Sequence, residues 1–276
     1  MFNLLTSDRG TMIDSGFYKI ELPLTGNLFE ELFHSIEFES VAKGRVGNHL
    51  VRVEAKGIPI VRTTTKYTIP AHNFSAIHHN IVEAINHTII KESVPNIPTQ
   101  HFNNALIEVY DCSYAKMNYH SDQCLDLAAD SYIGVFSCYA QPDQLSEQNI
   151  RRLLIKDKIT NEESEIELTH NSVVLFSSET NTKFQHKIIL KPTPNGKPIV
   201  PDIKWLGITF RTSKTYIQFN DNLPYFVTGD LLDLANQEQE SEFFKLRGQE
   251  NRSLDFVYPN LTYTLSLADR MVPKSS

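Results

Sequence analysis

Cysteine is scarce in this chain, with three residues among 276. An odd number at no zinc-ligand spacing argues against a disulfide framework and against a cysteine-rich metal site. We therefore expect Cys112, Cys124 and Cys138 to be reduced thiols that act as small, partly buried side chains. Oxidation of Cys112 or Cys124 stays open, because both flank the histidine motif described below.

Long hydrophobic runs are also missing. Hydrophobic residues make up 41% of the chain, enough for a substantial core. No apolar run reaches the roughly 18 residues that suggest a membrane-spanning helix. Residues 1–8 have neither a basic start nor a long apolar stretch, so no secretory signal is visible. We expect a cytoplasmic protein without membrane contact, and a nuclear location stays open.

An excess of positive charge is missing as well, since the net charge is −7. This removes the simplest argument for nucleic-acid binding, which depends on basic side chains that meet phosphates. One stretch departs from the balance, with the single acid Glu54 among six basic residues. It either follows a phosphate backbone or forms a solvated strand face, and the sequence leaves both open. The six are Lys43, Arg45, Arg52, Lys56, Arg62 and Lys66.

One short motif has metal-binding chemistry. His120 and Asp122 stand two apart, and His186 follows far downstream. Two imidazoles and one carboxylate on one face of an iron leave its other positions open, as in non-heme Fe(II) oxygenases. A His-x-Asp pair alone is a weak signal in a chain with ten histidines, and a loop turn capped by Asp122 is the alternative.

The surroundings of the motif strengthen it. Phe102–Tyr110 leads into the His-x-Asp pair, Ser172–Phe176 leads toward His186, and Ile208–Arg211 follows. This order resembles the AlkB-like branch of the 2-oxoglutarate- and Fe(II)-dependent dioxygenases over residues 58–213. The resemblance implies a mainly β fold with flanking helices around a double-stranded β-helix, or jelly-roll, core.

The resemblance also implies an enzyme that uses Fe(II), 2-oxoglutarate and dioxygen. His120, Asp122 and His186 would hold the iron as the catalytic centre. His170 precedes the same strand, but His186 lies where the family places its distal ligand. Oxidative cleavage of 2-oxoglutarate to succinate and carbon dioxide would accompany hydroxylation of a C–H bond. On an N-methyl group the product would collapse to formaldehyde, which makes the step a demethylation.

Arg211 is the residue that we expect to bind 2-oxoglutarate, because a guanidinium fork matches a carboxylate. Tyr110 would add a phenol hydrogen bond, or else is an ordinary core tyrosine. Ser213 would complete the arginine-x-serine pair of other 2-oxoglutarate oxygenases. If Arg211 is not the cation, Lys191 is the alternative.

The strand that ends at Arg211 departs from the AlkB-like pattern. Trp205 and Gly207 stand where that pattern has an arginine and an asparagine. Glu108 stands where the asparagine of its asparagine-x-tyrosine pair would be. Which carboxylate of the cosubstrate Arg211 contacts therefore stays open.

The substrate is the least determined feature. Pro59–Tyr67 resembles the segment that forms part of the substrate lid in AlkB-like enzymes. Arg62 and Lys66 would then contact the phosphates of a single-stranded nucleic acid, and Tyr67 would stack on an unpaired base. The alternatives are a protein or small-molecule hydroxylase, which the acidic charge favours, and a catalytically silent binding module that keeps the barrel.

The hydrophobic pattern divides the chain into three parts. Residues 1–100 should hold helices, strands and the lid, with a helix over Phe74–Lys91 whose histidines are exposed. Residues 101–220 should form the catalytic core, and residues 221–276 a helix and a strand, all in one compact domain. Seven β-runs are expected in the core, at Leu106–Tyr110, Tyr132–Tyr139, Arg152–Ile155, Ile166–Leu168, Ser172–Phe176, Lys187–Leu190 and Trp205–Phe210.

Overall fold

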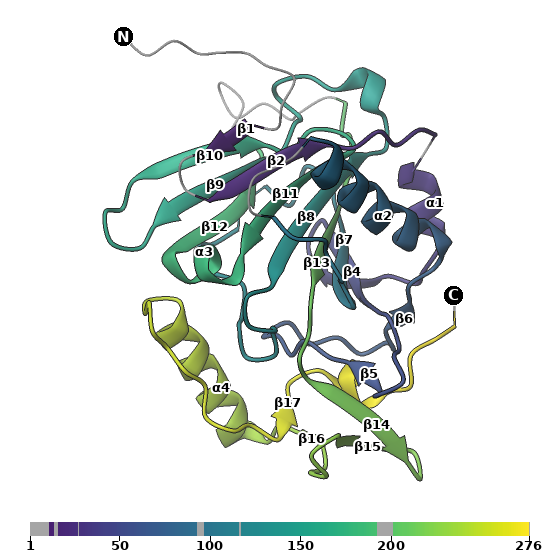
Figure 1. The fold of residues 1–276 in the computed structure, drawn as a ribbon, viewed down its shortest axis with the longest axis vertical. Helices are drawn as coiled ribbons and strands as arrows, with labels where there is room; N and C mark the ends of the chain where they lie inside the picture. The colour runs from purple at the N-terminus through teal and green to yellow at the C-terminus, as the bar shows by residue number, and fades with distance from the viewer. Residues whose placement is uncertain are drawn as a thin grey trace.

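The structure is a computed structural model that describes residues 11–13, 16–26, 28–92, 97–115, 117–191 and 201–275. Its largest element is a nine-stranded sheet in the order β1-β2-β11-β8-β13-β7-β4-β3, with β6 paired to β4 (Figure 1). The strands are β1 (Thr11–Ile13), β2 (Phe17–Glu21), β3 (Glu39–Ala42), β4 (Arg45–Val51), β6 (His72–Asn73), β7 (Asn104–Tyr110), β8 (Tyr132–Tyr139), β11 (Ser172–Ser177) and β13 (Trp205–Arg211).

A smaller antiparallel sheet packs on the inner face of the large one. It contains β10 (Glu163–Glu167), β9 (Arg152–Asp157) and β12 (Phe184–Ile189) in that order. Because strand side chains alternate between faces, each sheet sends every second residue into the shared interior. The buried cluster between the sheets includes Leu153 and Ile155 of β9 and Val174 of β11. All seven expected core strands are present, and the jelly-roll core is confirmed.

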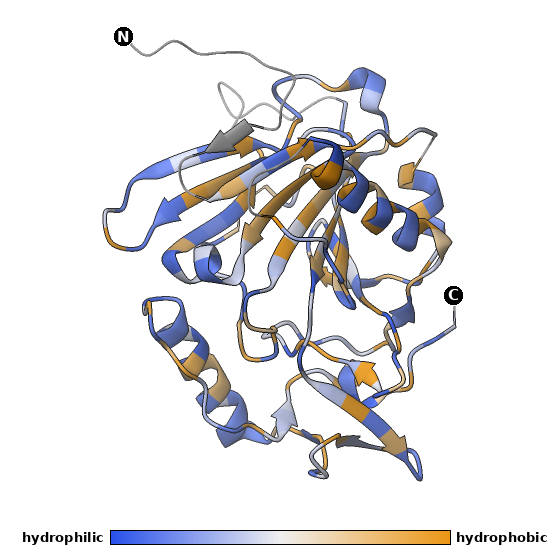
Figure 2. Cartoon of the chain, in the orientation of Figure 1, coloured by the Kyte–Doolittle hydropathy of each residue, from blue (hydrophilic) through white to orange (hydrophobic). Residues whose placement is uncertain are grey.

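Two helices cover the outer face of the large sheet, α1 (Leu28–His34) and α2 (Ala76–Lys91) (Figure 1). Ile77, Ile81 and Ile85 recur at helical spacing on α2 and are buried against the sheet. Their partners include Phe210 on β13. Figure 2 shows hydrophobic residues concentrated in the strands of the large sheet, whereas hydrophilic residues predominate on the C-terminal helix.

The C-terminal part adds small elements at one end of the barrel (Figure 1). The hairpin of β14 (Tyr216–Asn220) and β15 (Leu223–Phe226) pairs with β5 (Ile58–Pro59). A parallel pair of β16 (Asp233–Leu234) and β17 (Tyr263–Thr264) flanks α4 (Gln237–Glu250). The part of the chain that the structure describes also contains the short helical elements α3 (Ser178–Lys183), η1 (Pro142–Gln144) and η3 (Leu267–Arg270).

Strands from the first 100 residues are integral to the large sheet. β2 pairs with β11, and β4 pairs along its whole length with β7. The N-terminal part and the core therefore share one sheet. Among the described residues, no helix combines the length and the apolar character needed to cross a membrane.

One expectation about α2 was wrong, because His78 is not exposed. Its side chain is fully buried, and the Ser75 amide donates to His78 Nδ1 at 3.0 Å. This contact takes the place of the glutamate or glutamine that usually closes a capping box. Burial lowers the pKa of His78 to about 4, so the imidazole is neutral at neutral pH.

We predict that His78→Gln makes the protein less sensitive to acid. Unfolded His78 has a pKa of about 6.5, so between pH 6.5 and 4 the unfolded state binds the extra proton and stability falls as pH falls. Glutamine can still accept the Ser75 amide but does not titrate. Between pH 7 and pH 5 the variant should lose about 2 kcal/mol less unfolding free energy than the parent.

Urea unfolding at the two pH values measures the difference. The other buried histidines are common to both proteins and cancel in the comparison. An equal loss in parent and variant would show that His78 is already protonated in the folded state.

Candidate active site

The candidate active site begins with a backbone bridge between a loop and a strand. The His120 amide donates to the His186 carbonyl at 3.0 Å, and the His186 amide donates back at 2.7 Å. His186 lies on β12, whose other edge is hydrogen-bonded to β9. This bridge brings the two imidazole centroids to 4.7 Å although 66 residues separate them in sequence (186 minus 120).

Asp122 completes a group of three possible metal ligands. One ligand atom from each of His120, Asp122 and His186 lies within 4.8 Å of the others. Asp122 Oδ1 is 3.9 Å from His120 Nε2 and 3.5 Å from His186 Nε2. The three donor atoms are close enough together that one metal ion could be held among them. The donor set therefore fits Fe(II).

The orientation and charge state of the histidines suit ligation. His120 Nδ1 lies 3.0 Å from the Asn118 carbonyl, so this nitrogen carries the proton and Nε2 is left as the ligand atom. Burial and the neighbouring His186 lower the pKa of His120, which keeps the ring neutral. His170, the competing residue, lies elsewhere and accepts the Tyr139 amide at 3.1 Å.

Arg211 holds the carboxylate of Asp122. Its Nε and Nη2 both donate to Asp122 Oδ2, at 2.9 and 2.7 Å. Burial alone would raise the pKa of Asp122, but Arg211 and the two imidazoles outweigh it and hold the pKa well below its usual value. The carboxylate is therefore ionised, with Oδ1 free to face the metal. Arg211 Nη1 is buried without a hydrogen-bond partner.

Asn181 on α3 fixes the backbone of Asp122. Its Oδ1 accepts the Asp122 amide at 2.7 Å, and its Nδ2 donates to the Asp122 carbonyl at 2.8 Å. Asn181 is fully buried, so water does not compete for these bonds. No sequence motif marks Asn181 as a residue that positions a ligand. Its place in the turn before β12 was visible, but its partner 59 residues away was not.

The C-terminal extension, residues 221–276, binds the rest of the loop that carries His120 and Asp122. We call this loop the ligand loop. Asn251 accepts the Ser121 amide at 3.0 Å, and Glu250 accepts the Cys124 amide at 2.7 Å. Arg247 donates to the Ser121 carbonyl and pairs with Glu250. The end of α4 and the residue that follows it therefore bind the backbone on both sides of Asp122, at Ser121 and at Cys124. Sequence reasoning left this extension without a role.

The sequence comparison agrees with the geometry. Residues 27–211 match the family model described as the 2OG-Fe(II) oxygenase superfamily. The chain belongs to this superfamily. Enzymes of this kind are 2-oxoglutarate-dependent dioxygenases, and the bound iron supplies oxygen activation coupled to decarboxylation of the cosubstrate.

Two solved structures are similar to this oxygenase. The structure of OsALKBH1 is 16% identical, covers 74% of this chain and 99% of its own, and has a TM-score of 0.45. A prolyl-4-hydroxylase from Pseudomonas putida is 12% identical, covers 71% and 92%, and has a TM-score of 0.40. No curated protein matches the sequence.

The oxygenase keeps its thiols away from metal chemistry. Among the described residues Cys112, Cys124 and Cys138 are free, as expected. Cys124 lies two residues after Asp122 and would compete for the iron only as a thiolate. Burial, followed by the nearby Glu250, raises the pKa of Cys124 to about 11. The thiol is therefore protonated at neutral pH.

The expected cosubstrate residues lie in two different settings. Tyr110 is buried in the barrel interior, and its hydroxyl donates to Glu108 at 2.6 Å. Glu108 also accepts from Arg45 Nε at 2.6 Å. Ser213 has another role, because its hydroxyl donates to the Ile60 carbonyl at 2.6 Å and accepts the Thr215 amide. Ser213 thus holds a turn. These bonds engage the hydroxyl that we expected to contact the cosubstrate.

Lys191 is also engaged elsewhere. Its Nζ lies 2.8 Å from Glu165 on β10.

The expected substrate residues do not form a lid surface. Tyr67 is 0% exposed and its ring packs edge-on against His49 at 4.6 Å, so it cannot stack on a base. Arg62 is 4% exposed and pairs with Asp126 at 2.7 Å. Lys66 is at the surface, where Glu240 neutralises it at 2.6 Å. The expected stacking role of Tyr67 is therefore corrected, while the phosphate contacts expected of Arg62 and Lys66 stay a prediction.

Most cations of the basic stretch are paired with acidic residues within the protein. Arg45 pairs with Glu108, and Arg52 and Lys56 both pair with Glu54. With the pairs of Arg62 and Lys66, five of the six cations have an acidic partner. The basic stretch therefore forms mainly ion pairs within the protein, and it offers no row of unpaired cations to a phosphate backbone.

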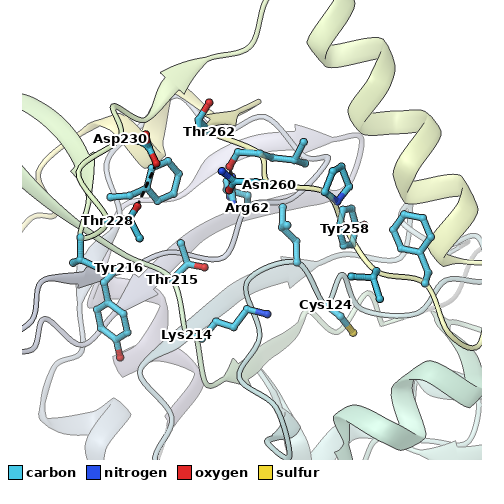
Figure 3. Close-up of a pocket in the computed structure, with 17 residues that line it drawn as sticks. Arg62, Cys124, Lys214, Thr215, Tyr216, Thr228, Asp230, Tyr258, Asn260 and Thr262 are labelled. Atoms are coloured by element: carbon cyan, nitrogen blue, oxygen red, sulfur yellow. Dashed lines mark hydrogen bonds between the residues drawn. The ribbon is translucent and has the colours of Figure 1, made fainter.

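A pocket of about 570 Å³ lies between the ligand loop and the C-terminal extension (Figure 3). We call it the C-terminal pocket. Residues 214–216, 226–228, 230 and 256–262 line it, together with Arg62, Cys124 and Leu125. Figure 3 shows Lys214 extending across the pocket toward the side where Cys124 lies. The wall that contains Cys124 continues directly from Asp122.

We predict that His120→Ala, Asp122→Ala and His186→Ala each abolish tight metal binding and turnover. Each substitution removes one of the three metal ligands, and the two that remain are too few to hold the metal tightly. Titration with Mn(II) under nitrogen measures binding, and succinate release measures turnover. His170→Ala is the matched control and should behave like the parent. Full binding in His186→Ala, with loss in His170→Ala, would reassign the distal ligand.

We predict that Asn181→Ala weakens metal affinity by about 10- to 100-fold, the usual effect of removing a residue that orients a ligand. The two hydrogen bonds to the Asp122 backbone would be lost while every ligand atom remains. Thr182→Ala on the same helix is the control, because Thr182 donates only to the Ser178 carbonyl. Equal Mn(II) affinity in parent and Asn181→Ala would mean that Arg211 alone positions Asp122.

Proposed function

We propose that this oxygenase oxidises a C–H bond on a discrete organic group that binds in the C-terminal pocket. The product is a hydroxylated compound, or a demethylated one when the group is N-methyl. The observation that carries this proposal is the shared wall, since Cys124 and Leu125 continue the ligand loop and also line the pocket. A group bound there lies beside the loop that holds the proposed iron ligands.

The lining of the pocket favours a ligand with both apolar and polar parts. Its volume of about 570 Å³ is in the range of sites for small molecules. Phe226, Phe256 and Tyr258 provide aromatic surface, while Lys214 and Asp230 provide one charge of each sign. A small molecule, or one side chain of a protein, suits this lining better than a long polyanion.

Oxidation of an alkylated base in single-stranded nucleic acid is the second candidate. The resemblance of the motif order around His120 and Arg211 to AlkB-like enzymes supports it, and one base would fit the pocket volume. Phosphate contacts would have to come from outside the basic stretch, since its cations are mostly paired.

The test begins with the enzyme alone. The Fe(II)-loaded protein with 2-oxoglutarate and oxygen should release succinate slowly, and Asp122→Ala should not. Candidate substrates are then added, with succinate and formaldehyde both measured. The panel contains N-methylated amino acids and peptides, N-methylated small amines, and N-methylated single-stranded DNA and RNA at two salt concentrations.

We predict that Asn260→Trp lowers substrate-stimulated turnover at least about tenfold and leaves slow uncoupled succinate release intact. Asn260 is exposed and lines the pocket, so an indole there fills space without disturbing the core. Lys245→Trp, on the exposed face of α4, is the matched control. Unchanged stimulation in Asn260→Trp would place the substrate elsewhere.

A further inference from the structure

The barrel interior contains an arginine that the site described above does not use. Arg151 precedes β9, and its side chain is 1% exposed. Its Nη1 donates to the Tyr114 carbonyl and its Nη2 to the Asp111 carbonyl, both at 2.7 Å. Among the residues that the structure describes, no carboxylate forms an ion pair with it. Two neutral carbonyls are therefore its acceptors.

The other buried or partly buried arginines near the barrel have anionic partners. Arg211 is held by Asp122, and Arg45 by Glu108. Arg152, the next residue along the chain, pairs with Glu165 and Glu167. A buried charge without a counter-ion costs several kcal/mol, by the usual order of magnitude for desolvation. Burial also lowers the pKa of Arg151 from its ordinary value, which reflects the same cost.

Arg151 faces the strand that carries Arg211. Its Cζ lies 5.0 Å from the Tyr110 ring centroid and 5.9 Å from that of Trp205. Tyr110 and Trp205 are register partners on β7 and β13. Because alternate residues of a strand share a face, Trp205 and Arg211 both point into the barrel. Arg151 thus reaches the same interior from the opposite sheet.

Trp205 prevents position 207, the nearest inward-facing position on β13, from carrying a basic side chain. Its indole lies over Gly207, and a Cβ added to Gly207 would be 2.0 Å from the ring. No side chain can therefore project from position 207 while Trp205 is in place. Among the described residues, Arg151 is the one arginine that lies beside both this indole and the Tyr110 ring, whereas Arg45 lies beside the Tyr110 ring alone.

We propose that Arg151 binds the carboxylate of 2-oxoglutarate that lies farther from the iron, with Tyr110 beside it. The cosubstrate supplies the anion that Arg151 lacks, and Arg211 remains on Asp122. The guanidinium can form a two-point contact with this carboxylate. The inference depends on cosubstrate use by the superfamily, and it does not depend on which substrate is oxidised.

The test compares two ligands that differ only at this carboxylate. 2-Oxovalerate has a methyl group where 2-oxoglutarate has its far carboxylate. Binding of each to the Mn(II)-loaded protein is measured under nitrogen by calorimetry. The parent should prefer 2-oxoglutarate, and Arg151→Gln should weaken 2-oxoglutarate by about tenfold or more, equivalent to about 1.4 kcal/mol. Its affinity for 2-oxovalerate should stay within about twofold of the parent.

Three further variants make the result specific. Arg152→Gln removes an adjacent buried arginine that has its own carboxylates, and it should keep the parent's preference. Arg45→Gln and Arg211→Gln test the competing cations. The proposal is overturned if Arg151→Gln keeps the preference for 2-oxoglutarate, or if Arg45→Gln or Arg211→Gln alone removes it.

Folding is checked by circular dichroism and thermal unfolding. If Arg151→Gln does not fold, Arg151→Lys keeps the charge but loses the fork. It should then weaken 2-oxoglutarate measurably and leave 2-oxovalerate unchanged, and equal effects on both ligands would contradict the proposal. Failure of the proposed pocket would change substrate-stimulated turnover only, so the two failures can be told apart.

Discussion

The ion pair between Asp122 and Arg211 is the interaction on which the rest of the site depends. A carboxylate buried beside two imidazoles would be protonated or displaced unless a cation held it. Arg211 keeps it ionised and occupies Oδ2, which leaves Oδ1 for the metal. The order of the chain follows from this need, since β13 must run through the middle of the large sheet to deliver Arg211 to a loop 89 residues earlier.

The same loop explains why the chain continues past β13. A loop that carries two ligands two residues apart has few backbone hydrogen bonds of its own, and flexibility there would spread the ligand atoms. Asn181 binds the backbone of Asp122 from one side, and Asn251 and Glu250 bind Ser121 and Cys124 from the other. The C-terminal extension is thus part of the scaffold of the metal centre, and it also supplies most of one wall of the C-terminal pocket.

Much of the fold could be predicted because its signals are local. Runs such as Tyr132–Tyr139 show β-character within a few residues, and the histidine motif is recognisable together with the order of the segments around it. The residues that orient the ligands could not be found this way. Asn251 meets Ser121 across 130 residues, and neither position differs from an ordinary surface residue in sequence. The same limit explains the wrong expectation for Tyr67, because the sequence of an irregular segment does not show whether an aromatic side chain lies at the surface or in the core.

The contacts in the barrel interior explain the departures from the AlkB-like pattern. As sequence, Trp205, Gly207 and Glu108 look like three lost polar contacts. In the structure the indole of Trp205 requires glycine at 207. Glu108, the register partner of Gly207, forms an ion pair with Arg45 and accepts a hydrogen bond from Tyr110. Removal of a cation from β13 would leave a dianionic cosubstrate unbalanced in a dry interior. In our proposal Arg151, on the opposite side of the barrel, supplies that charge.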